Sequence, residues 1–194
     1  MPRVASQMVE LGTPAPDFSL PDPTGAMHAL SDAADSKAVL IVFLCNHCPF
    51  VKHLADELAA MTSKYAPDGL ATFGIMPNDI ETHPDDGPEH MATEATSRGY
   101  TFPYLYDKDQ SVAKAFKAMC TPDFFLYGPD RTLVYRGQFD DSRPDNGTAT
   151  GDDLDAAIEA VIYGDPVPAE QMPSLGCNIK WRPGNEPDYV TQTT

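Results

Sequence analysis

Apolar side chains form two kinds of pattern along this chain, short continuous runs and stripes at helical spacing. The runs at residues 38–44 (AVLIVFL) and 70–76 (LATFGIM) are each typical of a strand that is buried on both faces. Between the two runs, residues 49–65 carry apolar side chains at spacings of four, four and three, which predicts a helix with one apolar face. The apolar positions of this helix are Phe50, Leu54, Leu58 and Met61.

The rest of the pattern continues this alternation of strands and helices. Asp109 is expected to cap one of the later helices, and Thr150 with Asp153 resembles a capping box at the start of the last one. The alternation predicts an α/β fold with parallel strands in the middle of the sheet and an antiparallel hairpin at one edge. The further predicted elements are a hairpin over 17–30, a helix over 88–98, a strand over 102–106, a helix over 110–119, strands over 123–127 and 132–137, and a helix over 152–163.

The chain is expected to form one domain over residues 1–194, with a core over about 11–163. The segment 164–194 carries five prolines and no periodicity. It also holds the only tryptophan, Trp181, and the last cysteine, Cys177, which a purely disordered tail rarely contains. We therefore expect this segment to be an extension that packs against the core, with Trp181 as a packing anchor.

Charge and hydropathy exclude two classes of partner. The formal net charge of −16 repels phosphate backbones, so nucleic acid is not an expected partner. No segment approaches the roughly 20 apolar residues that a membrane helix needs, so no membrane association is expected either. The N-terminal segment lacks the apolar core of a signal peptide, which leads us to expect a cytoplasmic protein.

The chemistry of this sequence is concentrated in its cysteines. There are four, Cys45, Cys48, Cys120 and Cys177, which is too few for a disulfide scaffold in a chain of this length. Cys45 and Cys48 form a single C-x-x-C pair, and zinc sites more often use two such pairs. The pair follows a buried strand and precedes Pro49, a residue favoured in the first turn of a helix. Unpaired backbone N–H groups at a helix start stabilise a thiolate.

Polar residues follow the second apolar run. Asn78 and Asp79 lie just beyond the strand over 70–76 and are candidates for assisting proton transfer. His83 and His90 lie in the acidic stretch 80–90, where we expect solvated surface groups.

Several motifs together resemble a known superfamily. A strand, C-x-x-C and helix near the start, with Thr121-Pro122 before a closing hairpin, resembles the thioredoxin fold. The segments APDFSLPDPTG, CNHCPFVKH, CTPDFFLYGPD and PSLGCNIKW are similar to peroxiredoxin-like proteins of the AhpC/TSA family that carry a thioredoxin-type C-x-x-C, and to thiol-disulfide oxidoreductases of the TlpA/ResA type. The resemblance implies a central mixed sheet flanked by helices, an N-terminal hairpin and an extended C-terminal tail.

The resemblance also implies roles for site residues. Cys45 would be the nucleophile and the more solvent-exposed thiol, and Cys48 would resolve the mixed disulfide. His47 would help stabilise the thiolate, as a histidine does between the cysteines of DsbA and protein disulfide isomerase. Pro122, preceded by Thr121, would be a cis-proline that faces the pair and offers its backbone to an extended peptide or partner thiol.

The sequence departs from both relatives at the site. Leu44 stands where thioredoxins usually have tryptophan before the first cysteine. The peroxiredoxin pattern P-x-x-x-T-x-x-C fits neither Cys45 nor Cys48, which argues against a peroxiredoxin-type peroxide pocket.

We therefore expect a thiol-disulfide oxidoreductase in redox homeostasis or antioxidant defence. It needs no cofactor, because electrons travel on sulfur and no glycine-rich phosphate loop is present. Its partner would be a disulfide or thiol on a protein or a small molecule. The sequence selects no oligomeric state, and a dimer stays open.

Several alternatives remain open at this point. One is a thiol peroxidase acting on hydroperoxides, and another is a non-catalytic interaction domain with buried, inert cysteines. A third is a copper or zinc module with Cys45, Cys48, and His47 or His53 as ligands. Cys120 is either a packed apolar residue or an additional redox thiol, and Cys177 either packs or folds back to resolve a disulfide.

Overall fold

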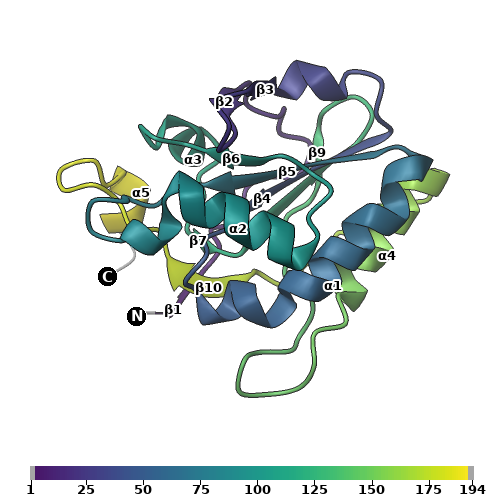
Figure 1. Cartoon of the computed structure of the whole chain (residues 1–194). Coiled ribbons are helices and arrows are strands. Elements are labelled where there is room, and N and C mark those ends of the chain that lie inside the picture. Colours follow the sequence, from purple (N-terminus) through teal and green to yellow (C-terminus); the bar gives the residue numbers. More distant parts are fainter. Residues whose placement is uncertain (1–2, 192–194) are drawn as a thin grey trace.

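A five-stranded mixed sheet forms the centre of the computed structural model, which describes residues 3–191 (Figure 1). The ends of the expected domain, residues 1–2 and 192–194, lie outside the described residues. The strand order is β6-β5-β4-β8-β9, with β4, β5 and β6 parallel and β8 and β9 antiparallel to their neighbours. These strands are β4 (Ala38–Phe43), β5 (Leu70–Met76), β6 (Tyr104–Tyr106), β8 (Asp123–Tyr127) and β9 (Leu133–Tyr135).

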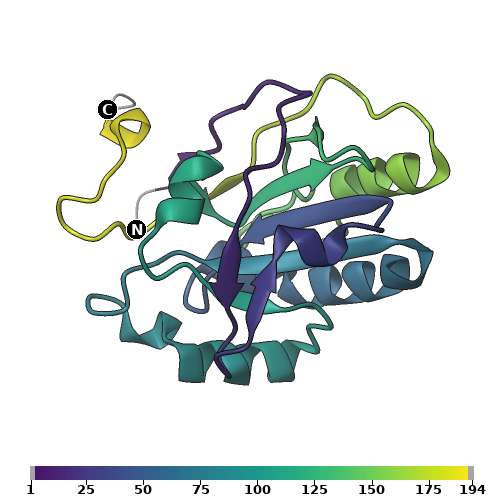
Figure 2. The same ribbon diagram turned by 90° about the horizontal axis from the view of Figure 1, so that it is seen from above.

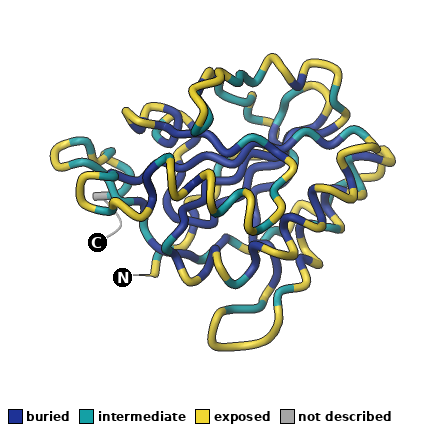
Figure 3. The backbone as a smooth tube through the Cα atoms, viewed as in Figure 1, coloured by how far each residue is buried: buried dark blue, intermediate teal, exposed yellow. Residues whose placement is uncertain are grey.

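Both faces of the sheet are covered, as continuous apolar strands require. Three helices cover one face: α1 (Pro49–Tyr65), α2 (Pro88–Arg98) and α4 (Asp152–Tyr163). The other face packs against α3 (Ser111–Ala115), the hairpin of β2 (Ser19–Pro21) and β3 (Met27–Ala29), and the short helix η1 (Leu30–Ala33) (Figure 2). All six residues of β4 are fully buried, and the strands run through the buried interior in Figure 3. None of the helices between residues 3 and 191 is both long and apolar enough to cross a bilayer.

A second, three-stranded antiparallel sheet joins both ends of the chain to its middle. Its order is β1 (Arg3–Ala5), β10 (Leu175–Asn178) and β7 (Cys120–Thr121). The C-terminal segment thus passes along the body of the protein, and β10 and β1 lie side by side in Figure 1. Trp181 is half-buried against the core between the sheet and α3. Beyond it lies α5 (Asp188–Thr191), and single turns η2 (Ala66–Asp68) and η3 (Pro84–Asp86) connect the larger elements.

The predicted α/β alternation is confirmed, and the helix predicted over 49–65 has the same bounds as α1. The helix predicted over 110–119 is too long. It begins at Ser111 because Gln110 has a left-handed backbone (φ 64°), and a second left-handed residue, Lys117 (φ 55°), follows its end.

The caps of two helices differ from the predictions, since a second carboxylate joins Asp109 at α3 and the capping box predicted at α4 is absent. At α3 the carboxylate of Asp107, in addition to that of Asp109, accepts backbone N–H groups, from Val112 (3.3 Å) and Ala113 (2.7 Å). At α4 no capping box forms, because the N-cap is Gly151 in a left-handed conformation. The carboxylate of Asp140 accepts the N–H groups of Thr150 and Gly151 instead, both at 2.7 Å.

Candidate active site

The two cysteines of the C-x-x-C pair lie where β4 passes into α1. Cys48 is the N-cap of α1, with an extended backbone (φ −70°, ψ 125°), and Pro49 occupies the first turn. The carbonyl of Cys48 accepts the N–H of Lys52 at 3.0 Å, which closes that turn. The predicted position of the pair at a helix start is therefore confirmed.

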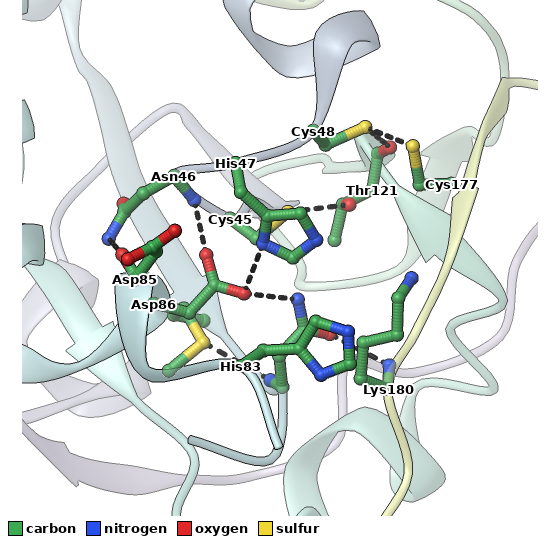
Figure 4. A network of polar contacts seen from close by, with 12 residues as sticks. Cys45, Asn46, His47, Cys48, His83, Asp85, Asp86, Thr121, Cys177 and Lys180 are labelled. Atoms are coloured by element: carbon green, nitrogen blue, oxygen red, sulfur yellow. Dashed lines mark hydrogen bonds and ion pairs between the residues drawn. The ribbon is translucent and has the colours of Figure 1, made fainter. Parts of the chain in front are cut away.

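The loop before β8 faces the pair. The bond between Thr121 and Pro122 is cis, as expected. The hydroxyl of Thr121 lies 3.1 Å from the sulfur of Cys45, and its carbonyl oxygen lies 3.1 Å from the sulfur of Cys48 (Figure 4). Thr121 therefore contacts both sulfur atoms, and β7 brings it there from 73 residues along the chain.

Asp86 is a functional candidate that the sequence analysis missed. Its carboxylate is fully buried in the turn η3 and lies 2.7 Å from Nδ1 of His47. It also accepts the backbone N–H of Asn46 and the side-chain amide of Asn78, each at 2.8 Å (Figure 4). Burial alone would raise the pKa of Asp86, but the contacts with His47, Asn78 and Asn46 outweigh it and hold the pKa below its usual value.

Two expectations about the surroundings of His47 are corrected. The ring of His83 stacks on that of His47 with centroids 5.2 Å apart, so His83 is half-buried at the site rather than fully solvated. Asn78 bridges Asp86 and the backbone N–H of Lys180 (2.8 Å), which makes it a structural link. Asp79 faces Arg182 and Thr82 instead of a thiol. The only signal for Asp86 was its place in an acidic stretch, which is typical of solvated loops.

The expected difference in exposure between the two thiols is absent, because Cys45 is 1% exposed and Cys48 0%. Burial, a hydrogen bond to Cys48 and the charge of Asp86 raise the pKa of Cys45 well above its usual value. Hydrogen bonds from Cys177, Cys45 and the N–H of Val51 lower the pKa of Cys48. The contacts of Cys48 with the other two sulfurs, and to a lesser extent with the first turn of α1, therefore lower the pKa of Cys48, whereas that of Cys45 is raised.

The two remaining cysteines differ in their surroundings. The sulfur of Cys177 lies 2.7 Å from that of Cys48, although the two residues are 129 positions apart. Cys120 is fully buried, with its sulfur 3.4 Å from the carbonyl oxygen of Pro122 and 4.0 Å from the hydroxyl of Ser6. Burial raises the pKa of Cys120 well above its usual value. All four cysteines are free thiols, and all four are buried.

The site also has the donor atoms of a metal centre. One donor atom from each of Cys45, His47 and Asp86 lies within 4.8 Å of the others. A thiolate, an imidazole and a carboxylate together suit zinc. Of the residues considered as ligands from the sequence, His53 lies elsewhere and contacts Ser142 at 2.8 Å.

Comparison with known proteins gives a consistent match. A sequence model of the AhpC/TSA family matches residues 11–136. A Mycobacterium tuberculosis protein that bears the name "Putative peroxiredoxin" is 30% identical over 128 residues, which cover 66% of this chain and 75% of that protein.

Solved structures extend the likeness to the whole fold. A hypothetical protein from Sinorhizobium meliloti 1021 is similar at a TM-score of 0.91 and 50% identity, over 93% of this chain and 99% of that one. The thioredoxin domain of a thiol-disulfide oxidoreductase from Bacteroides vulgatus is similar at a TM-score of 0.61 and 16% identity, over 78% and 99% of the two chains. This last likeness confirms the predicted thioredoxin fold.

Proposed function

Because this chain belongs to the AhpC/TSA family and has the thioredoxin fold, we propose that it is a thiol-disulfide oxidoreductase that works through Cys45 and Cys48. Its wider class, an oxidoreductase with thiol or peroxide substrates, follows from the family and its relatives. The observation that carries the finer proposal is the contact of both sulfurs with one residue, Thr121, next to the cis bond to Pro122. Such a pair can form and break a disulfide with little movement of the backbone.

The reaction proceeds in two exchanges on sulfur. Cys45 attacks a partner disulfide as its proton passes to the Cys48 thiolate, and one partner thiolate leaves. Cys48 then attacks Cys45, the Cys45–Cys48 disulfide forms, and the second partner sulfur departs with the proton from Cys48. One partner disulfide is reduced to a thiol and a thiolate, while the Cys45 thiol and the Cys48 thiolate are oxidised to a disulfide.

Three neighbouring residues support these steps. The hydroxyl of Thr121 donates to the Cys45 sulfur as it gains charge. The carboxylate of Asp86 holds the imidazole of His47 beside Cys45. Pro122 fixes the backbone that carries Thr121.

The surroundings of Cys45 favour a small partner. One edge of the β7 backbone already pairs with β10, so an extended peptide can pair at that edge only if β10 moves. On the side of Asp86, the half-buried ring of His47 lies beside Cys45, and the half-buried ring of His83 stacks on it. A low-molecular-weight disulfide needs only a displacement of these rings, so we expect it to react faster than a protein disulfide.

A stopped-flow assay tests this proposal, with each reduced variant mixed with 4,4′-dithiodipyridine. Cys45→Ser is expected to lose at least 90% of the rapid thiol release, because the first attack requires that sulfur. Cys48→Ser is expected to stop at the mixed disulfide on Cys45, seen by mass spectrometry as a stable adduct. Cys120→Ala is the matched control and keeps the wild-type rate. Equal rates for wild type and Cys45→Ser would overturn the proposal.

A thiol peroxidase is the second candidate, favoured by the family match and the 30% identity to the mycobacterial protein. The same enzymes mixed with hydrogen peroxide distinguish the two. Peroxide rates equal to those of a free thiol support disulfide exchange alone. A fast reaction that leaves sulfenic acid on one cysteine assigns peroxidase activity to that cysteine.

A further inference from the structure

Cys48 has two other cysteines as neighbours, Cys45 and Cys177. Cys48 shares hydrogen bonds with Cys45 on one side and with Cys177 on the other, where the two sulfurs are 2.7 Å apart. Figure 4 shows Cys177 reaching Cys48 from the side opposite to His47 and Asp86. The C-x-x-C pair thus has a third thiol within bonding reach, and the exchange proposed above does not use it.

The backbone holds Cys177 firmly in this place. Cys177 lies on the central strand of the three-stranded sheet, opposite Arg3 of β1 and Thr121 of β7. The preceding residue, Gly176, packs so tightly that a Cβ there would lie 2.2 Å from the carbonyl oxygen of Thr121. Only glycine fits, and this close approach brings the sulfur of the next residue against Cys48.

We propose that Cys177 is a third redox thiol, which takes the disulfide from Cys45 and forms a Cys48–Cys177 bond. The inference rests on the proposed function, because the Cys45–Cys48 disulfide is its starting point. It assigns to the C-terminal segment a chemical role in the reaction, beyond its role in the sheet.

The step is a thiol-disulfide exchange within one chain. The sulfur of Cys177 attacks that of Cys48, the Cys45–Cys48 bond breaks and the Cys48–Cys177 bond forms. The proton of Cys177 passes to the departing sulfur of Cys45. The number of disulfides is unchanged, so the step needs no further oxidant or reductant. Its result is a free Cys45 beside the half-buried histidines and a disulfide at the junction of α1 and β10.

Peptide mapping tests this relay, because trypsin places the thiols on separate peptides. Cys45 and Cys48 lie together on residues 38–52, Cys120 on 118–131 and Cys177 on 137–180. Reduced protein receives one equivalent of 4,4′-dithiodipyridine, is quenched in acid, alkylated and digested. The expected product in wild type is peptide 38–52 linked to 137–180, with the alkyl group on Cys45.

Three variants complete the experiment. Cys120→Ala keeps the wild-type link, whereas Cys177→Ser contains only the disulfide inside peptide 38–52. Cys177→Ala, which removes the polar atom, repeats the measurement in case the serine disturbs the fold, and circular dichroism checks that both Cys177 variants are folded. A wild-type digest with only the internal disulfide and an alkylated Cys177 would overturn the relay, as would a link from Cys45 to Cys177.

The relay and the proposed function fail in different ways. If Cys45→Ser loses rapid exchange but no link to Cys177 forms in wild type, the function stands and the relay is wrong. If wild type and Cys45→Ser release thiol equally fast, the function is wrong, and the relay falls with it even where a Cys48–Cys177 bond is found.

Discussion

Asp86 is a fully buried carboxylate that connects the cysteine loop to the segment before α2. Asp86→Asn keeps the shape of the side chain but removes the charge beside His47 and weakens the contacts with Asn46 and Asn78. We expect a loss of roughly 1–3 kcal/mol in the free energy of unfolding at neutral pH, measured by urea denaturation. Asp85→Asn, at the exposed neighbour, is the control and is expected to change little.

The pH dependence of that variant follows from the lowered pKa of Asp86. A carboxyl whose pKa is lowered by folding stabilises the protein above its unfolded pKa, and this stabilisation is lost as the pH falls through the folded value. The difference between wild type and Asp86→Asn should therefore be largest near pH 7 and shrink below about pH 4. A difference that grows on acidification would contradict the role given to this carboxylate.

Residues at the site were predictable where the signal is local in the sequence. Cys45, His47 and Cys48 share one loop, and Thr121-Pro122 is a short motif in its own right. Asp86 was not predicted, and the position of Cys177, a candidate thiol, was left open, because their contacts lie 40 and 129 residues away. The same holds for the fully buried ion pair of Arg136 with Asp123, since charged side chains are seldom fully buried and no local pattern shows that these two meet.

At the scale of elements, the start of α3 carries a pH-sensitive contact. Asp107 accepts the N–H groups of Val112 and Ala113, and burial raises the pKa of its carboxyl to about 6 from 3.8. The folded state therefore holds this proton to a higher pH than the unfolded chain, and stability falls as the pH rises from about 4 to about 6. The loss is up to about 1.4 kcal/mol for each pH unit in this interval.

Asp107→Asn is expected to remove this loss of stability between pH 4 and pH 6, because the amide oxygen of asparagine carries no charge and still accepts the N–H of Ala113. The free energy of unfolding of the variant, measured in urea at pH 4, 5 and 6, should vary less with pH than that of wild type. Asp109→Asn is the matched control. A hydrogen bond from Ser111 lowers the pKa of Asp109, so the contribution of this carboxyl to stability changes with pH in the opposite direction to that of Asp107. An unchanged pH profile for Asp107→Asn would show that this carboxyl is ionised throughout the interval.

The register of β10 depends on Gly176. Gly176→Ala places a methyl group 2.2 Å from the carbonyl oxygen of Thr121, so β10 must move away from β7. We expect a loss of about 1–3 kcal/mol in stability and a large decrease in the peptide linked through Cys177. In Gly128→Ala, the control, the nearest atom is the end of the Asp130 side chain at 3.3 Å. Wild-type linkage in Gly176→Ala would mean that β10 tolerates a shifted register.

The long elements and the short strands of the two hairpins and of β6 could be predicted, but β1, β7 and β10 could not. The strands β4 and β5 and the helices α1, α2 and α4 follow continuous or periodic apolar patterns over six or more residues. The strands β1, β7 and β10 have only two to four residues, too few for an alternation to stand out. Their pairing depends on contacts between the two ends of the chain, which no local pattern records.

At the scale of the whole molecule, charge is the dominant property. With 29 acidic and 13 basic side chains, the net charge of −16 opposes the compact state. Raising sodium chloride from about 0.05 to about 0.5 M screens this repulsion, because the Debye length falls several-fold below its low-salt value. We expect Tm at pH 7 to rise by several degrees, as read by circular dichroism. A Tm that falls with salt would mean that attractive surface pairs outweigh the repulsion.

The contact between Cys48 and Cys177 has a consequence for the unfolded chain. A bond there would close a covalent ring spanning 129 positions, and the conformational entropy removed from the unfolded state corresponds to roughly 5 kcal/mol. A bond between Cys45 and Cys48 closes only a minimal ring and restricts the unfolded chain far less. The two oxidised forms would therefore differ in resistance to heat, so that the position of one disulfide would determine the thermal stability of the whole protein.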